Sequence, residues 1–161
     1  MAAARVSIQA ADFDVSAELA ELRRADLRVG AVCSFVGTVR QKHPDGSPEV
    51  LSLELEHYPG MTEKAIEAMI DEAQRRFDIH AARVVHRVGL LAPGDQIVFA
   101  AVTSAHRGQS FQACEFLMDY LKTQAPFWKK ERTPQGEKWV DARVADDEAL
   151  ARWGIRAGNA G

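Results

Sequence analysis

The chain has 161 residues, of which 47% are hydrophobic and 27% are charged, and its formal net charge at pH 7 is −3. This length predicts a single domain over residues 1–161, and the composition excludes disordered, collagen-like and coiled-coil chains. No apolar run of about 18 residues is present, which excludes a transmembrane helix, and we expect no signal peptide. The only two cysteines, Cys33 and Cys114, lie far apart in the sequence, which suits a reducing cytoplasm.

Charge is unevenly distributed along the chain. Residues 1–100 hold 11 Lys/Arg and 15 Asp/Glu, whereas residues 101–161 hold 9 and 8. Within the second part, Lys122, Lys129, Lys130 and Arg132 fall among residues 122–132, with Glu131 as the only acidic residue. An acidic chain is a poor candidate for a dedicated nucleic-acid binder, but one concentrated basic stretch indicates an anion site.

The first half of the chain predicts a helix and two strands. A helix is expected over residues 15–25, with Ser16 able to cap it. Residues 28–40 are apolar and rich in β-branched side chains, as in a well-buried strand. After a turn-rich loop, residues 50–57 alternate apolar and polar side chains, the period of a strand with one wet face.

The second half predicts two longer helices and two hairpins. A helix follows Tyr58-Pro59-Gly60, with Thr62 as its expected N-cap, and residues 82–91 and 96–105 form a hairpin around Pro93-Gly94-Asp95. The second helix spans about 109–124 and ends before Pro126. A second hairpin joins 127–132 to 138–143, a short helix covers 146–153, and 154–161 is an expected disordered tail. We therefore predict an α+β fold, with a largely antiparallel sheet and helices packed on one face.

His106 and Arg107 precede Gly108, where an apolar strand ends and a helix begins. Free N–H groups and the helix dipole favour an anion at such a terminus, and an arginine binds phosphate in bidentate fashion. The alternative is an exposed arginine beside a histidine that forms only local hydrogen bonds. For His86 and Arg87, in mid-strand, a structural role is favoured.

Lys122 falls in the last turn of the second helix, and Lys129 follows Pro126. Favourable pairing with a helix C-terminus explains Lys122 taken alone. The clustering of cations instead favours an anionic partner, and a desolvated lysine can act as base or nucleophile. Phe127 and Trp128 are equally consistent with a stacking wall for a flat heterocycle and with core packing.

Arg40 and Arg143 each end a predicted strand, a frequent position for ligand-binding side chains. Several site types lack their motifs: no GxGxxG or P-loop sequence occurs. There is also no CxxC or HExxH, and the five histidines are scattered, so no metal site is supported. Cys33 and Cys114 lie in apolar contexts that favour inert thiols.

Several stretches resemble the large, catalytic subunit of molybdopterin synthase. They are FVGTVR (35–40), LELEHYPGMTEKA (53–65), VVHRVGLLAPGDQIVFAAVTSAHR (84–107), FLMDYLKTQAPFWKKE (116–131) and WVDAR (139–143). The resemblance covers about residues 5–153 and implies an α/β hammerhead-type fold. It also implies a homodimer that binds two small, ubiquitin-like sulfur-carrier subunits. Members of the family convert cyclic pyranopterin monophosphate into molybdopterin with sulfur from the carrier's C-terminal thiocarboxylate, and no further cofactor is implied.

By position, the resemblance assigns catalytic roles to Lys122 and Lys129. The positions implied to bind substrate are Thr38, Val39, Arg40, His106, Arg107, Lys122, Lys129, Lys130, Glu131 and Arg143, the last reaching from the partner chain. Thr38 replaces a lysine expected in some relatives, so its side chain is expected to contribute less charge. The chain ends Asn159-Ala160-Gly161 and not Gly-Gly, which fits the acceptor of the carrier's tail.

The resulting hypothesis is a sulfurtransferase subunit. Lys122 stabilises an oxyanion or acts as acid–base, and Lys129 polarises the substrate or the carrier's terminus. One alternative is a non-catalytic anion-binding scaffold for a partner's C-terminus. Another is single-stranded nucleic-acid binding, which predicts a steep salt dependence.

Overall fold

The computed structural model describes residues 4–42, 45–46, 49–140 and 151–154, which contain two four-stranded sheets. Sheet A has the order β1 (Val6–Gln9), β4 (Ala81–Arg87), β6 (Gln96–Ser104), β2 (Ala31–Thr38). Sheet B has the order β5 (Gly89–Leu91), β3 (Ser52–His57), β7 (Phe127–Thr133), β8 (Gly136–Trp139). Every pairing is antiparallel except β1 with β4.

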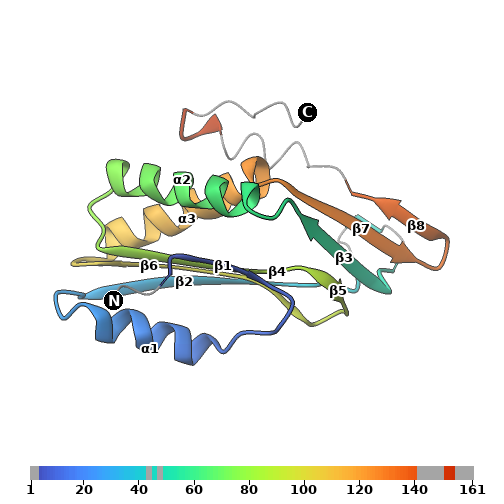
Figure 1. Cartoon of the computed structure of the whole chain (residues 1–161), viewed down its shortest axis with the longest axis horizontal. Coiled ribbons are helices and arrows are strands. Elements are labelled where there is room, and N and C mark those ends of the chain that lie inside the picture. Colours follow the sequence, from blue (N-terminus) through green and yellow to red (C-terminus); the bar gives the residue numbers. More distant parts are fainter. Residues whose placement is uncertain (1–3, 43–44, 47–48, 141–150, 155–161) are drawn as a thin grey trace.

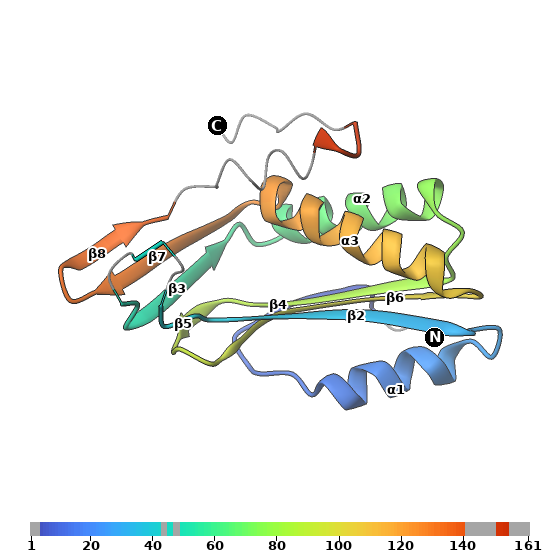
Figure 2. The same cartoon turned by 180° about the vertical axis from the view of Figure 1, so that it is seen from behind.

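Helices cover both faces of sheet A. Helices α2 (Met61–Arg76) and α3 (Arg107–Gln124) lie on one face, and α1 (Val15–Ala25) lies on the other (Figures 1 and 2). The main core forms where apolar stripes of α2 and α3, including Ile66, Met69 and Leu117, pack on Val84 and Val102 of the sheet. A smaller cluster under α1 contains the Phe13 and Phe99 rings, whose centroids are 6.0 Å apart.

The two sheets meet where one strand changes partners. At Gly89 the backbone has φ +94°, a region that suits glycine, and the chain leaves β4 in sheet A to become β5 in sheet B. Val39, Leu53, Leu55 and Leu91 form a separate buried cluster at this point. Sheet B therefore projects from one end of sheet A (Figure 1), and the cluster fixes how it is attached.

The predicted α+β class, its mostly antiparallel pairing and the first hairpin are confirmed. The second hairpin is confirmed up to Trp139, and residues 141–143 of its second strand lie outside the described residues. Two details differ. The strands form two sheets because Gly89 breaks the strand expected over 82–91. The two long helices share one face as expected, but α1 covers the other, because its apolar side chains pack against Phe99 and Val85.

Two predicted caps are wrong. Asp14, not Ser16, caps α1, because its carboxylate accepts the Ala17 N–H at 3.0 Å. The N-cap of α2 is Gly60, not Thr62. The helix expected over 146–153 lies mostly outside the described residues, as does nearly all of the tail at 154–161. Within the described part of the chain, no helix is long and apolar enough to cross a membrane.

Candidate active site

Arg40 is exposed directly after β2, at the end of sheet A that carries sheet B. Its neighbour Val39 is buried among the apolar side chains at the sheet junction. The Val39 N–H donates to Asp95 O at 2.9 Å, and its carbonyl accepts the Gly94 N–H at 2.8 Å. Thr38, exposed, pairs with Gln96 after a register shift. The buried Val39 therefore anchors the segment that presents Arg40.

Lys122 and Lys129 lie on either side of the turn between α3 and β7. Lys122 is exposed in the last helical turn, and Ala125 takes the extended conformation that a following proline favours. Lys129 is exposed on β7, opposite Leu55 of β3. Because Leu55 packs against Val39, Lys129 and Arg40 lie on the same junction. The fold thus brings Arg40, Lys122 and Lys129 to one end of sheet A.

A buried histidine lies beside Lys129. His86 is 7% exposed, and its ring stacks on Phe127 with centroids 3.9 Å apart and planes 18° apart. His86 Nδ1 donates to Arg87 O at 2.8 Å. The pKa of His86 is lowered to about 4, chiefly by burial and in smaller part by the positive charges of Lys129 and His57, while the hydrogen bond to Arg87 O opposes the shift. The imidazole is therefore neutral at pH 7, which confirms the structural role favoured for His86.

Strand β7 separates the predicted cations by face. Side chains alternate along a strand, so Lys129 and Glu131 lie on one face and Lys130 and Arg132 on the other. Glu131, 7% exposed, is opposite Leu53 and Lys138. The basic stretch of the sequence is thus divided between two faces of sheet B.

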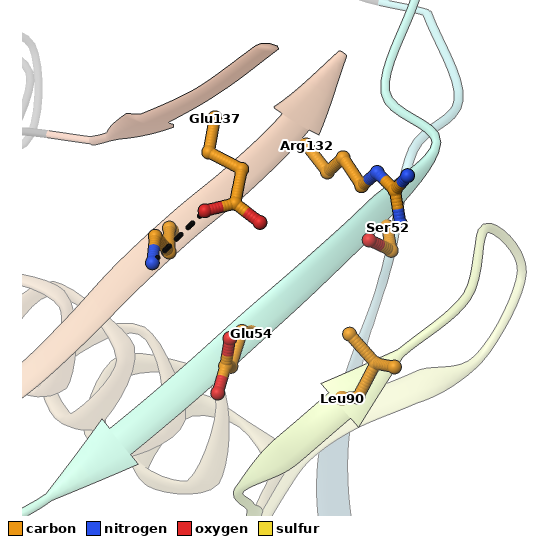
Figure 3. Close-up of a pocket in the computed structure, with 6 residues that line it drawn as sticks. Ser52, Glu54, Leu90, Arg132 and Glu137 are labelled. Atoms are coloured by element: carbon orange, nitrogen blue, oxygen red, sulfur yellow. Dashed lines mark ion pairs between the residues drawn. The ribbon is translucent and has the colours of Figure 1, made fainter.

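Lys130 lines a pocket of about 230 Å³ on the outer face of sheet B, together with Ser52, Glu54, Leu90, Arg132 and Glu137 (Figure 3). Its Nζ lies 3.0 Å from Glu137 Oε2 and 5.3 Å from the centre of the Trp139 ring. The hydrogen bond to Glu137, with the charges of Glu137, Glu54 and Glu56, raises the pKa of Lys130. Lys130 is therefore already paired with carboxylates on the face opposite Lys129.

His106 and Arg107 are exposed at the other end of α3. His106 is the N-cap without a side-chain capping bond, its carbonyl accepts the Ser104 hydroxyl at 2.5 Å, and the Arg107 carbonyl accepts the Ser110 hydroxyl at 2.8 Å. The helix rises about 1.5 Å per residue, which puts Arg107 about 22 Å from Lys122 along its axis. One chain therefore does not bring this pair to the lysines, and Arg143 lies outside the described residues.

An open apolar groove of about 290 Å³ runs between the edge strand β2 and α3. Its lining includes Cys33, Phe35, Phe111, Cys114 and Met118. Phe111 of α3 is 60% exposed, and Phe35 of β2 is 39% exposed. Burial, with the adjacent Cys33 thiol, raises the pKa of Cys114 to about 12, so the Cys114 thiol is inert as expected.

Comparison with known proteins agrees with this architecture. The sequence profile described as "MoaE protein" matches residues 8–124. A molybdopterin synthase catalytic subunit from Ralstonia nicotianae is 60% identical over 155 residues, covering 96% of this chain and 87% of its own length. The corresponding Escherichia coli subunit is 49% identical over 153 residues, 95% of this chain and 100% of the relative.

The chain belongs to the MoaE protein family. Its enzyme class, molybdopterin synthase catalytic subunit, is confirmed at that level. The solved MoaE protein of Burkholderia ambifaria is 56% identical and superposes with a TM-score of 0.82, covering 96% of this chain and 100% of that one. Molybdopterin synthase from Staphylococcus aureus is 29% identical, with a TM-score of 0.77, over 87% of this chain and 99% of that one.

Three residues that sequence reasoning missed as parts of the site hold the turn between α3 and β7. They are Tyr58, Thr62 and His86, which contact Trp128, Pro126 and Phe127. Tyr58 and Thr62 belong to the HYPGMT segment (57–62), which carried the resemblance without an assigned role. Their contacts are separated by about 40–70 residues of sequence, so no local pattern indicated them.

Proposed function

We propose that the chain converts cyclic pyranopterin monophosphate into molybdopterin with two sulfurs from a small carrier protein, in the cytoplasm. Each sulfur arrives on a C-terminal thiocarboxylate. Because one thiocarboxylate carries one sulfur, two carriers are consumed per product, and each is left as a carboxylate. The pterin is the substrate, and no further cofactor is invoked.

The placement of cations at the sheet junction carries this proposal. Arg40, Lys122 and Lys129 come from three segments and gather where β2, α3 and β7 end or begin. A substrate phosphate and an incoming thiocarboxylate are both anions, and preorganised cations stabilise the charge that develops during transfer. Lys122 stabilises the oxyanion or acts as the acid–base group, while Lys129 polarises the substrate or the carrier's terminus.

Two copies of the chain complete the site. His106 and Arg107 lie at one end of α3 and Lys122 at the other, and the groove with Phe35 and Phe111 lies between them. A two-fold axis that crosses this groove perpendicular to α3 places the start of one α3 beside the end of its partner, because the two helices then run antiparallel. It also covers exposed apolar side chains. The phosphate then binds Arg40 of one chain together with His106 and Arg107 of the other. Arg143 of that other chain reaches across the interface into the same site.

The carrier's tail enters at the same junction. One solved relative, from Helicobacter pylori, is a complex of subunits 1 and 2 of molybdopterin-converting factor, and at 20% identity and a TM-score of 0.70 it shares the fold of this chain. We extend its two-subunit assembly to this chain, with one carrier on each protomer of the dimer.

The test is reconstitution from purified components. The chain is mixed with thiocarboxylated carrier and cyclic pyranopterin monophosphate, and the dithiolene product is measured. Product that requires all three components supports the proposal. Carrier binding without sulfur transfer would instead identify a scaffold. Binding of single-stranded nucleic acid that weakens steeply with salt would identify the remaining alternative.

A further inference from the structure

The short connection between α3 and β7 sets how the two catalytic lysines lie relative to each other. It comprises Ala125 and Pro126, and Phe127 and Trp128 begin the strand. Proline has no N–H to donate, and the backbone bond across the connection joins Phe127 N–H to Ala125 O at 2.9 Å. The position of the connection relative to α2 and the two sheets therefore depends on contacts from those elements.

Thr62 makes the central contact. Its side chain is fully buried near the start of α2, where its hydroxyl donates to Pro126 O at 3.0 Å. The Thr62 hydroxyl oxygen also accepts the Tyr58 N–H at 3.0 Å. One hydroxyl thus joins the turn before α2 to the connection after α3, 64 residues further along the chain.

Two ring contacts hold the neighbouring residues. Tyr58 packs on Trp128, with ring centroids 4.0 Å apart. His86 stacks on Phe127 at 3.9 Å. Pro126, Phe127 and Trp128 are therefore contacted in turn by Thr62, His86 and Tyr58, which come from α2, β4 and the turn after β3.

The start of α2 is itself rigidly defined, so Thr62 has a fixed origin. Gly60 has φ +84°, which favours glycine, and its N–H donates to Glu63 Oε2 at 2.7 Å. The Thr62 N–H donates to Tyr58 O at 2.9 Å. These bonds hold the backbone on both sides of Thr62.

We propose that Thr62 is a positioning residue for Lys122 and Lys129. Its hydroxyl fixes the connection that joins their two segments and so sets the separation of the lysines. This inference rests on the proposed function, since it assigns Thr62 a part in the sulfur transfer. A misplacement of about 1 Å at a reacting centre can cost about a hundredfold in rate, so loss of one bond at the connection is expected to affect turnover.

The activity test compares Thr62→Val, which removes the hydroxyl at nearly constant shape, with Thr62→Ser, which retains it. We expect kcat to fall about tenfold or more in T62V, with KM for the pterin within about twofold, and T62S to recover at least half of the wild-type kcat. Ile70→Val is the matched control, because it is equally buried two turns further along α2. Its melting temperature is expected to fall with kcat unchanged.

A second readout does not depend on activity. Hydrogen exchange of the wild type, T62V and I70V is measured in the segment 125–129 and at the Tyr58 amide, which loses its acceptor in T62V. We expect about tenfold faster exchange in T62V alone. Unchanged exchange, or a T62V kcat within twofold of the wild type, would overturn the role of Thr62. If the wild type itself makes no product, the proposed function fails, whereas faster exchange in T62V still supports Thr62 as the clamp of the connection.

Discussion

At the scale of single residues, the environment of each lysine separates roles that composition cannot. Lys122, Lys129 and Lys130 are all basic residues within nine positions, yet they lie on a helix end and on two opposite faces of one strand. Lys130 pairs with Glu137 at 3.0 Å on the outer face of sheet B, whereas Lys129 is exposed on the face of β7 that meets the sheet junction. We therefore propose that Lys122 and Lys129, and not Lys130, supply the cations that act on the substrate.

Removing Lys122 tests the first assignment. We expect Lys122→Ala to lower the rate of product formation by about 10²–10³, the usual effect of losing one preorganised donor at a transition state. Because Lys122 is exposed, the melting temperature and carrier binding should stay unchanged. A variant that keeps more than half of the wild-type turnover would rule out this role.

Strand alternation makes a paired prediction for β7. Lys129→Ala should reduce turnover at least tenfold more than Lys130→Ala, because only Lys129 faces the sheet junction. Both variants are compared in the same reconstituted assay, and each serves as the control for the other. Equal losses would show that the two faces of β7 contribute alike.

Burial of His86 predicts a pH dependence of stability. The pKa of His86 is about 4 in the folded chain, against 6.5 for an ordinary histidine side chain, so the unfolded state binds a proton first as the pH falls. The contribution of His86 to the free energy of unfolding is therefore fully present above about pH 6.5. It is lost as the pH falls from 6.5 to 4, by at most about 3 kcal/mol. Urea unfolding of the wild type and of His86→Phe, measured across this range, checks the prediction. The slope should be smaller in H86F, which retains the ring stack.

At the scale of elements, the change of strand partner at Gly89 positions sheet B. The positive φ there is disfavoured for a residue with a side chain, although no heavy atom lies within 4 Å of an added Cβ. Gly89→Ala should therefore destabilise the fold through backbone strain alone, by about 1–2 kcal/mol. Gly108→Ala is the control, because Gly108 also has open space around it but lies in α3. It should be neutral or mildly stabilising in the same urea titration.

Helix α3 sets the spacing of the two halves of the proposed site. Its 18 residues hold the His106–Arg107 pair and Lys122 at opposite ends. No bend of a packed helix of this length brings its ends together, because the helix lies against β6 and β2 along its course. The position of the basic pair therefore requires a second copy of the chain if it serves the same substrate.

At the scale of the whole molecule, mixed dimers test this arrangement. Lys122→Ala and Arg107→Ala are each expected to be inactive, but a mixed dimer holds one site with both residues intact. Random pairing of equal amounts should therefore restore about a quarter of the wild-type activity. No recovery after subunit exchange would place both residues in one chain's site. Phe111→Glu, which puts a charge in the apolar groove, should prevent recovery by keeping the chains apart.

Much of the fold could be predicted because the signals are local. Each of these signals depends on residues that are close neighbours in the sequence. Examples are the alternation over residues 50–57, the helical stripe of Ile66, Met69 and Ile70, and the turn at Pro93–Asp95. The caps were harder, because Asp14 and Ser16 are both good cap residues and Gly60 has no side chain to signal one. The exposure of Phe111 and Phe35 was equally hidden from the sequence, because the spacing of apolar residues does not tell which of them other elements cover.

The sequence by itself determined the class of elements, the concentration of cations over 122–132, and the family, since these depend on residue identity and spacing. Only the tertiary structure decided which cations meet. Pairing of β7 with β3 brought Lys129 opposite the buried Leu55, packing of α3 on sheet A brought Lys122 to the end where sheet B begins, and the buried hydroxyl of Thr62 reached a carbonyl 64 residues away. Contacts of that range arise from packing of whole elements, and no local period in a sequence encodes them.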